Sequence, residues 1–282
     1  MIEKSQIAII IVLYQPSSSD LSNISLLGEM YQMVVVDNSS EESVFLKSNG
    51  AIQYIFNGGN LGIAEAQNIG LRIATKQKGI THIVFLDQDS RTTNDYPLAI
   101  AREFERHADG RRLAFLGPSV RNVETGDLYR SVVHHDQQTD VDFIARRDVI
   151  SSGGCTTVEC VKDIGLNDCR LFIDYVDFEW CWRAQSKGYA CGITPRLTIT
   201  HHVGQNTISL WGYLIIISSP KRYFYQFRNY LWLVRRKYVP LQWKIATGIK
   251  YAARMVYFPL CIRTGTQCWK YMMKGIYAGM RK

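Results

Sequence analysis

The stretch Ile83-Val84-Phe85-Leu86-Asp87-Gln88-Asp89-Ser90 decides the fold class of this 282-residue chain. Apolar residues that favour β-structure run directly into two carboxylates and a hydroxyl, which predicts a buried strand with a polar carboxyl end. Open α/β sheets bind their ligands at that end. Residues i and i+2 of an extended segment point the same way, so Asp87 and Asp89 are predicted to share a hard cation, Mg²⁺ or Mn²⁺. A solvated turn is the alternative interpretation.

The segments before this strand repeat the same arrangement. Strands are predicted over 7–14, 33–36, 51–56 and 81–86, and helices over 20–31, 63–78 and 96–106. The run Ile7 to Tyr14 is almost continuously apolar, as is typical of a strand covered on both faces. This alternation predicts an α/β fold with a mainly parallel sheet, flanking helices and a ligand site along one edge.

The second half of the chain gives weaker signals. It predicts a short strand over 114–116, a loop over 151–156, a helix from about 175 to Gly188, a strand over 189–200 and helices from Pro220 onward. We therefore expect a main domain over 1–215 and a basic, aromatic helical region over 216–282.

Charge is distributed very unevenly. The net charge is +8, but residues 1–179 hold 16 basic and 25 acidic side chains, whereas residues 180–282 hold 17 basic and none acidic. Such asymmetry predicts that the C-terminal part contacts something anionic, namely nucleic acid, phosphates or a lipid surface.

The seven cysteines form no CxxC pair and have no regular spacing. They favour reduced thiols in a cytoplasmic protein over a disulfide framework or a zinc site. The sequence shows no signal-peptide pattern and no apolar run of the ~18 residues that a membrane span requires. We expect a cytoplasmic protein.

Polar residues follow the other predicted strands as well. Asp37 could accept hydrogen bonds from a pyrimidine N–H or a ribose hydroxyl, or it could form a helix cap or an Asx turn. The segment NGGNLG at 57–62 matches neither the Walker pattern nor GxGxxG. Its glycines allow a ligand to approach the backbone, and a tight turn is the alternative. Asn68, on the following helix, reads as surface when taken alone.

A second acidic group lies in LFIDYVDFEW at 171–180. Asp174 and Asp177 are spaced i, i+3 and share a face if the segment is helical. A carboxylate in an apolar pocket holds its proton more tightly and is a better base near neutral pH. The alternative is pairing of these acids and Glu179 with basic residues on the same helix. Of the adjacent His201 and His202, one is predicted to join the metal site.

Together, IIIVLYQP, VVVDNSS, NGGNLGIAEAQNIG, FLDQDS, SSGGC and DYVDFEWCWRAQSKGY resemble, in order and spacing, the family 2 glycosyltransferases with the GT-A fold. The resemblance covers roughly residues 5–205 and is greatest to bacterial rhamnosyltransferases of O-antigen and surface-polysaccharide assembly.

The resemblance implies a role for each candidate residue. Asp37 corresponds to the acid that recognises the nucleotide base, and Asn60, Gly62 and Asn68 correspond to residues around the nucleotide. Asp87 and Asp89 correspond to the DxD pair that binds metal and diphosphate, and His201 corresponds to a further metal ligand. Asp177 corresponds to the catalytic base. The chain departs from the family at Val176, which replaces the usual acid before the base.

The chemistry expected from this resemblance is inverting transfer of a sugar from a nucleotide donor. A single in-line displacement needs one base on the acceptor hydroxyl, and a metal stabilises the diphosphate that leaves. For a rhamnosyltransferase the donor is dTDP-β-L-rhamnose and the product an α-rhamnoside. The acceptors of this branch are commonly polyprenyl-diphosphate-linked glycans.

The C-terminal tail interleaves aromatic and basic residues over 222–237. This composition predicts a helix at an anionic membrane interface, which places the protein peripherally on the inner face of the cytoplasmic membrane. The alternative is a helical subdomain that packs on the catalytic one or forms a homodimer contact.

Three other functions compete with this interpretation. A UDP-hexose transferase would use the same scaffold. A nucleotidyltransferase is expected to carry a glycine-rich, basic loop after the first strand, and QPSSSD at 15–20 is not one. A nucleic-acid-binding role leaves the acidic residues 1–179 unexplained, so we expect no nucleic-acid partner.

Overall fold

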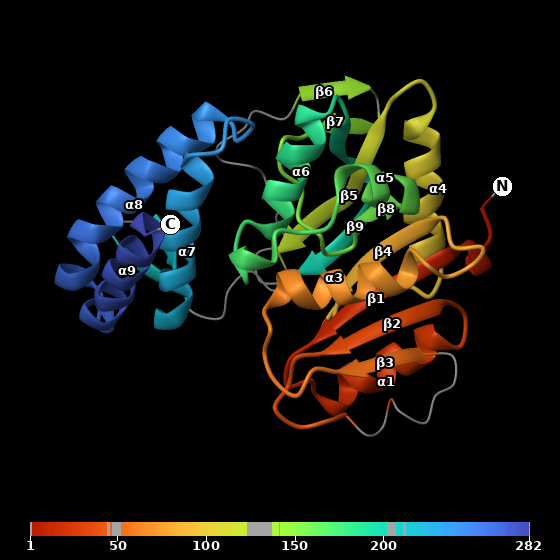
Figure 1. Cartoon of the computed structure of the whole chain (residues 1–282), viewed down its shortest axis with the longest axis horizontal. Helices are drawn as coiled ribbons and strands as arrows, with labels where there is room; N and C mark the ends of the chain where they lie inside the picture. Colours follow the sequence, from red (N-terminus) through yellow and green to blue (C-terminus); the bar gives the residue numbers. More distant parts are fainter. Residues whose placement is uncertain are drawn as a thin grey trace.

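The computed structural model describes residues 2–43, 46, 52–122, 137–140, 142–201, 207–210 and 213–281. Its main strands are β1 (Ile7–Leu13), β2 (Gln32–Asp37), β3 (Ile52–Phe56), β4 (His82–Asp87), β5 (Leu113–Asn122), β6 (Gln137–Asp140), β7 (Phe143–Ala145), β8 (Cys155–Thr157) and β9 (Ala190–His201). Within the described residues they form one nine-stranded sheet in the order β3-β2-β1-β4-β8-β5-β9-β7-β6 (Figure 1). Of these strands β7 and β8 run against the others, so the predicted mainly parallel sheet is confirmed.

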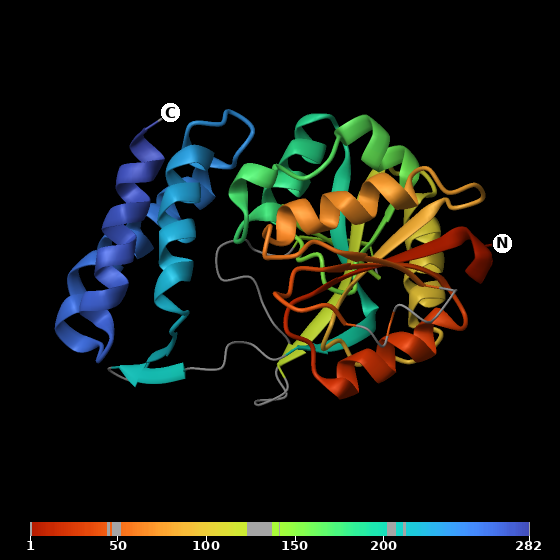
Figure 2. The same cartoon turned by 60° about the horizontal axis from the view of Figure 1, so that its bottom comes forward.

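Helices cover both faces of the sheet (Figure 2). One face carries α1 (Ser18–Gly28) and α4 (Tyr96–Ala108), and the other carries α3 (Ile63–Ala74), α5 (Val158–Ile164) and α6 (Val176–Ser186). Single 3-10 turns lie at η1 (Lys4–Gln6) and η2 (Cys169–Leu171). Because side chains alternate along a strand, Ile7, Ile9 and Ile11 of β1 pack in the first layer. Ala8 and Ile10 pack in the second.

The strand predicted over 114–116 is in fact ten residues long. β5 pairs with β9 in parallel from Leu113 opposite Ala190 to Asn122 opposite His201. Gly117 and Pro118 hide this strand from sequence analysis, because neither residue favours strand interiors. The register shifts between Pro118 and Ser119, next to the residue that lacks a backbone N–H.

The segment 151–156, predicted as a loop, ends inside a strand. Cys155 and Thr156 belong to β8, which pairs antiparallel with β4 and β5 and joins the two halves of the sheet. α5 follows it directly and was not predicted. Three residues are too few for a period-2 pattern, so the pairing partners on either side decide that this segment is a strand.

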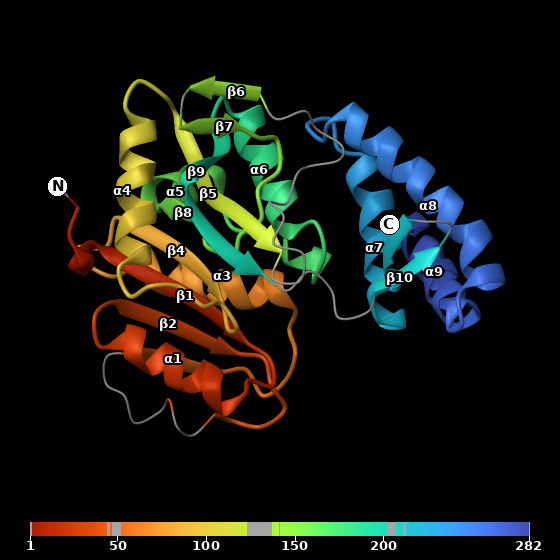
Figure 3. The ribbon, with the colours of Figure 1, turned by 180° about the vertical axis from the view of Figure 1, so that it is seen from behind.

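Three helices lie beside the sheet at the C-terminal end of the chain (Figures 1 and 3). They are α7 (Pro220–Val234), α8 (Leu241–Cys261) and α9 (Gly265–Met280), preceded by the hairpin of β10 (Thr207–Leu210) and β11 (Tyr213–Ile216). α7 and α9 pack closely, since a Cβ on Gly275 would lie 2.4 Å from the carbonyl oxygen of Phe224. The predicted domain boundary at 215/216 falls inside β11, and the division stays a prediction.

Buried polar contacts attach these helices to the segment before and within α6. Asn229 of α7 is fully buried, and its Nδ2 donates to the carbonyl oxygens of Leu171 at 2.9 Å and Ile173 at 2.8 Å. Arg236 lies 3.0 Å from Glu179, whose side chain is 1% exposed. In the described part of the chain, no helix has the length and apolar character needed to cross a membrane.

Candidate active site

The carboxyl ends of β1, β2 and β4 place two of the predicted residues along one edge of the sheet. Leu13 of β1 is opposite Asp37 of β2, and Val12 of β1 is opposite Asp87 of β4. Asp37 and Asp87 are therefore separated by one intervening strand, or about 10 Å at the usual strand spacing. This spacing would allow one residue to contact a nucleoside and the other its diphosphate.

Asp37 is fully buried. Its Oδ1 accepts from the backbone N–H of Ser39 at 2.8 Å, and its Oδ2 accepts from Ser43 Oγ at 2.8 Å and Tyr54 Oη at 2.7 Å. Burial alone would raise the pKa of Asp37, but the bonds from Ser39, Tyr54 and Ser43 outweigh it and hold that pKa below its usual range. The bond to Ser39 is the Asx turn considered from the sequence. Because Asp37 is fully buried, contact with a base would require the residues that cover it to move.

The NGGNLG segment forms a turn before α3. Asn60 Oδ1 accepts from the N–H of Gly62 at 2.8 Å, and Asn38 Nδ2 donates to the carbonyl of Gly62 at 3.2 Å. Gly62 has φ +83°, and a Cβ there would lie 2.6 Å from Phe172. Only glycine fits this position, for both backbone and packing reasons. The turn thus connects β2 to the segment before α6.

Asn68 is not the surface residue that the helix pattern alone predicts, because it is only 2% exposed. Its Nδ2 donates to the carbonyl of Asn167 at 2.9 Å, and its Oδ1 accepts from the N–H of Asn167 at 2.8 Å. Gln67 accepts from the Asn167 side chain at 3.0 Å. Asn68 therefore links α3 to the segment before α6 through hydrogen bonds. Its predicted contact with the nucleotide stays a prediction.

Asp87 and Asp89 do not lie in one extended segment, contrary to the geometry assumed from the sequence. The N–H of Asp87 donates to Ser90 Oγ at 3.0 Å, and the N–H of Ser90 donates to the carbonyl of Asp87 at 3.0 Å. This is the turn considered as the alternative. Gln88 inside it bonds the N–H of Tyr14 at 2.7 Å, which fixes the turn to the end of β1.

The two carboxylates still fit a metal that binds together with a nucleotide. Asp87 is half-buried and Asp89 is exposed. Mg²⁺ typically binds through one or two carboxylates while substrate phosphates and water complete its coordination. Among the described residues, no three His, Cys, Asp or Glu side chains surround a common point. His201 is described only by its backbone, at the end of β9, and His202 lies outside the described residues.

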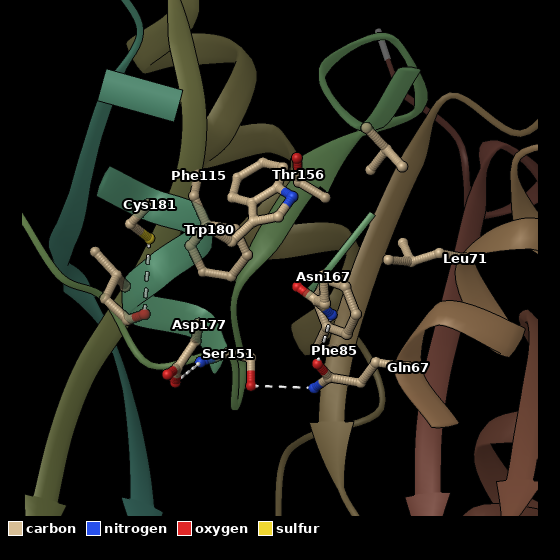
Figure 4. Close-up of a pocket in the computed structure, with 12 residues that line it drawn as sticks. Gln67, Leu71, Phe85, Phe115, Ser151, Thr156, Asn167, Asp177, Trp180 and Cys181 are labelled. Atoms are coloured by element: carbon tan, nitrogen blue, oxygen red, sulfur yellow. Dashed lines mark hydrogen bonds between the residues drawn. The ribbon is translucent and has the colours of Figure 1, made fainter. Parts of the chain in front are cut away.

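Asp177 lies in the first turn of α6, as predicted. Its Oδ2 accepts from the N–H of Ser151 at 3.1 Å, and its Oδ1 accepts from the N–H of Phe178 at 2.9 Å. A small cavity of about 20 Å³ lies beside it, lined by apolar side chains that include Phe115 and Trp180 (Figure 4). A space of this size holds about one water molecule.

Burial raises the pKa of Asp177 to about 6, although the backbone N–H groups of Ser151 and Phe178 lower it. A carboxylate with this pKa is largely ionised at neutral pH, yet it is a much stronger base than an exposed aspartate. General bases work best when their pKa lies near the working pH. The environment of Asp177 therefore suits it to remove a proton from a hydroxyl.

Asp174 and Asp177 are separated in the structure, contrary to the shared face that a helix would give them. Asp174 precedes α6 and has φ +67°, as does Tyr175, so the helix begins only at Val176. Arg222 of α7 binds the Asp174 carboxylate with contacts of 2.8 and 3.0 Å. Positive φ at two successive non-glycine residues is strained and must be held by surrounding contacts.

Glu179 pairs with a basic residue of its own helix, which is the alternative considered from the sequence. Arg183, four residues later, lies 3.0 Å from its Oε1, and Tyr238 donates to the same atom at 2.5 Å. With Arg236 also in contact, Glu179 is a structural acid that joins α6 to the segment after α7.

Sequence analysis missed Gln67, Ser151 and Asn167, which line the cavity beside Asp177. Figure 4 shows them around the cavity, where Gln67 Nε2 donates to Ser151 Oγ at 3.3 Å and Asn167 donates to Gln67. These residues are 84 to 100 positions apart in their bonded pairs, so no local pattern reports their contact.

Comparison with known proteins shows what the chain is similar to. Residues 21–154 match the model of glycosyl transferase family 2. The chain is 31% identical over 291 residues to "dTDP-rhamnosyl transferase RfbF" of Shigella flexneri, which covers 97% of this chain and 94% of that protein. It is 24% identical over 200 residues to "Low-salt glycan biosynthesis hexosyltransferase Agl10" of Haloferax volcanii, covering 66% of this chain and 64% of that protein.

Two solved structures share the fold. GalNAc-T7 with UDP, GalNAc and Mn²⁺ aligns with a TM-score of 0.57 at 15% identity, covering 96% of this chain and 54% of that one. Staphylococcus aureus TarS aligns with a TM-score of 0.57 at 14% identity, covering 97% of this chain and 49% of that one. This chain thus spans about half the length of each, and the likeness identifies the fold as GT-A.

Proposed function

The chain belongs to glycosyl transferase family 2, and on that premise we propose that it transfers L-rhamnose from dTDP-β-L-rhamnose to a hydroxyl of a lipid-linked glycan. The donor is inferred from 31% identity, over almost the whole of both chains, to a dTDP-rhamnosyl transferase. Surface-polysaccharide synthesis of the O-antigen type is the process in which such a product would be used.

The observation that carries the mechanism is the position of Asp177. Its carboxylate is fixed by the N–H groups of Ser151 and Phe178, and burial raises its pKa to about 6. We assign to it the removal of the proton from the acceptor hydroxyl as that oxygen attacks the anomeric carbon. One displacement with one base inverts the anomeric configuration, so a β-linked donor gives an α-rhamnoside.

Residues at the sheet edge would hold the donor. We assign Asp87, Asp89 and His201 to a Mg²⁺ or Mn²⁺ ion, which when bound neutralises the charge of the departing diphosphate. The structural neighbour that contains UDP and Mn²⁺ supports use of a divalent ion by this fold. Asn60 and Gly62 form the turn assigned to the nucleotide.

We also propose that the protein binds the inner face of the cytoplasmic membrane peripherally through α8. Leu241, Ile245, Ile249, Val256 and Leu260 are 55–79% exposed. At 100° per residue they fall within about 100° of the helix circumference, so they form one apolar stripe. Apolar helix faces accompanied by basic residues bind anionic bilayers, and residues 180–282 contain 17 basic and no acidic side chains.

This stripe differs from the residues first associated with the membrane. Tyr223 and Leu233 of the aromatic tail are completely buried, and Phe227 is 3% exposed. They pack against α8 and α9, or against α6, instead of facing outward. These buried residues of α7 therefore build the helical region, and the aliphatic stripe of α8 is exposed for contact with lipid.

A UDP-hexose-dependent reaction is the second candidate, favoured by the match to a hexosyltransferase over 66% of the chain. Purified protein should be incubated with each nucleotide sugar and a lipid-linked acceptor panel, with released nucleotide measured and the product examined by NMR. We expect turnover with dTDP-β-L-rhamnose and an α-linked product. Turnover with UDP-hexoses alone would support the second candidate instead.

A further inference from the structure

A cleft of about 230 Å³ lies between the sheet domain and α8. From the sheet side it is lined by Arg146 and Ile150, and from α8 by Trp243, Thr247 and Lys250. Aromatic walls with a few polar groups at a junction between structural units are typical of ligand sites. Among the residues whose side chains the structure describes, none of those assigned to the nucleotide or the metal lines this cleft.

The cleft adjoins the proposed base. Ile150, in its wall, immediately precedes Ser151, whose N–H is bonded to Asp177. Phe178, also in its wall, immediately follows Asp177. Val149 lines both this cleft and the small cavity beside Asp177. A molecule in the cleft would therefore lie next to the two segments that hold the base.

Positive charge is in excess on the α8 side of the cleft. Lys250 lies near Arg254 of the same helix and Asp174 before α6. The Asp174 carboxylate is already bound by Arg222 through contacts of 2.8 and 3.0 Å. The Lys250 side chain is exposed, so it stays charged at neutral pH. Asp148, on the sheet side, is the acid among the lining residues.

The two sides of α8 have different characters. Trp243, Thr247 and Lys250 line the cleft, whereas Ile245 and Ile249 belong to the exposed apolar stripe. At 100° per residue the two sets lie about 100° or more apart around the helix. An α-helix is ~10 Å across, so the cleft and a lipid surface on the stripe would be separated by only about one helix diameter.

We propose that this cleft is the acceptor subsite, with a phosphate of a lipid-linked acceptor at Lys250 and the acceptor saccharide against Trp243 and Phe178. The assignment rests on the proposed function, because it uses Asp177 as the base that faces the acceptor. The ligand class is an amphiphile in which a phosphate group joins a lipid to a sugar. Lys250 is a positioning residue for that phosphate and takes no part in bond formation.

The test uses phenoxyundecyl diphosphate, a lipid diphosphate without a sugar, titrated into the full-length protein by calorimetry. We expect the native protein to bind it and Lys250→Gln to bind about tenfold more weakly, since a charge-assisted hydrogen bond is lost. Lys270→Gln, the same change at an exposed site on α9, should bind like the native protein. Affinity for dTDP should be unchanged in both variants.

Three results would overturn the assignment. The native protein could fail to bind the lipid diphosphate, both variants could bind it equally weakly, or inorganic pyrophosphate could bind as tightly as the lipid diphosphate.

Flotation with phosphatidylglycerol vesicles separates headgroup binding from acceptor binding, because Lys250→Gln should float like the native protein. If it did not, Lys250 would belong to the membrane surface. Failure of dTDP-rhamnose turnover with intact diphosphate binding would refute the donor assignment alone.

Discussion

The backbone N–H of Ser151 donates a 3.1 Å hydrogen bond to Oδ2 of Asp177. Ser151 Oγ in turn accepts from Gln67 of α3, and Gln67 accepts from the side chain of Asn167. The proposed base is thereby fixed to a loop, a helix and the segment before α6 at once. Phe178 and Ile150, which flank the two bonded residues, line the cleft beneath α8.

Replacing Asp177 with Asn should lower transfer by about 10²–10⁴-fold, because it keeps the side-chain volume and removes the proton acceptor. The dTDP affinity should change little. Rhamnose transfer and dTDP binding measure the two effects. Asp109→Asn, at an exposed position after α4, is the matched control and should retain full activity. Full transfer by Asp177→Asn would refute the assignment of the base.

The rate of transfer should fall as the pH drops through about 6, since burial raises the pKa of Asp177 to that value and the protonated acid cannot act as a base. A pH profile of kcat at saturating metal and donor measures this. An acidic limb nearer 4, the usual range of an exposed aspartate, would contradict the effect of burial.

The same shift in pKa predicts a pH-dependent stability difference. Between about pH 4 and 6 the unfolded chain ionises Asp177 while the folded protein keeps it protonated, so the native protein loses stability as the pH rises. Asp177→Asn cannot ionise. Its melting temperature relative to the native protein should therefore be higher at pH 7 than at pH 4.5. A difference that is constant or falls over this range would contradict the prediction.

Turnover should require Mg²⁺ or Mn²⁺ and should be lost in excess EDTA. Asp89→Asn should cost ~10²-fold or more, because metal stabilisation of a leaving group is worth several kcal/mol. The Asp89 side chain is exposed, so the variant should melt like the native protein. Paramagnetic resonance of Mn²⁺ with dTDP measures binding separately from activity. Unchanged Mn²⁺ binding in Asp89→Asn would remove that residue from the site.

The double variant Ile245→Gln with Ile249→Gln should bind anionic vesicles at least tenfold more weakly, because two apolar side chains no longer enter the interface. Flotation with phosphatidylglycerol vesicles measures this. Leu26→Gln on α1 is the control, since Leu26 and Ile245 are both 55% exposed. Equal flotation of the double variant and the control would contradict a membrane role for α8. Binding should also weaken as salt increases.

Replacing Glu179 with Gln should destabilise the protein by about 3–5 kcal/mol, because it leaves Arg183 and Arg236 with a buried, uncharged partner. Thermal or urea unfolding measures the loss. Glu159→Gln, at an exposed position on α5, should have almost no effect. A Glu179→Gln protein as stable as the native one would show that this ion-pair group does not hold the helical region in place.

The sequence by itself determined that the sheet is mainly parallel, where its first four strands lie in the chain and which helices lie between them. The apolar run from Ile7 to Leu13 predicts a strand buried on both faces, and the structure places its alternate residues in two separate cores. It also determined that Asp37 and Asp87 lie at the carboxyl ends of two of these strands. These features could be predicted because burial of a strand or helix leaves a periodic pattern in consecutive residues.

The tertiary structure alone decided how the side chains of the candidate site are used. Asn68 is buried by Asn167, 99 residues later, and Asp174 is bound by Arg222, 48 residues later. The cleft that reaches Lys250 likewise exists only because α8 packs beside the Asp177 segment. Contacts between such distant positions depend on how whole helices and strands pack against one another. A single contact of this kind produces no periodic pattern in the sequence around either residue.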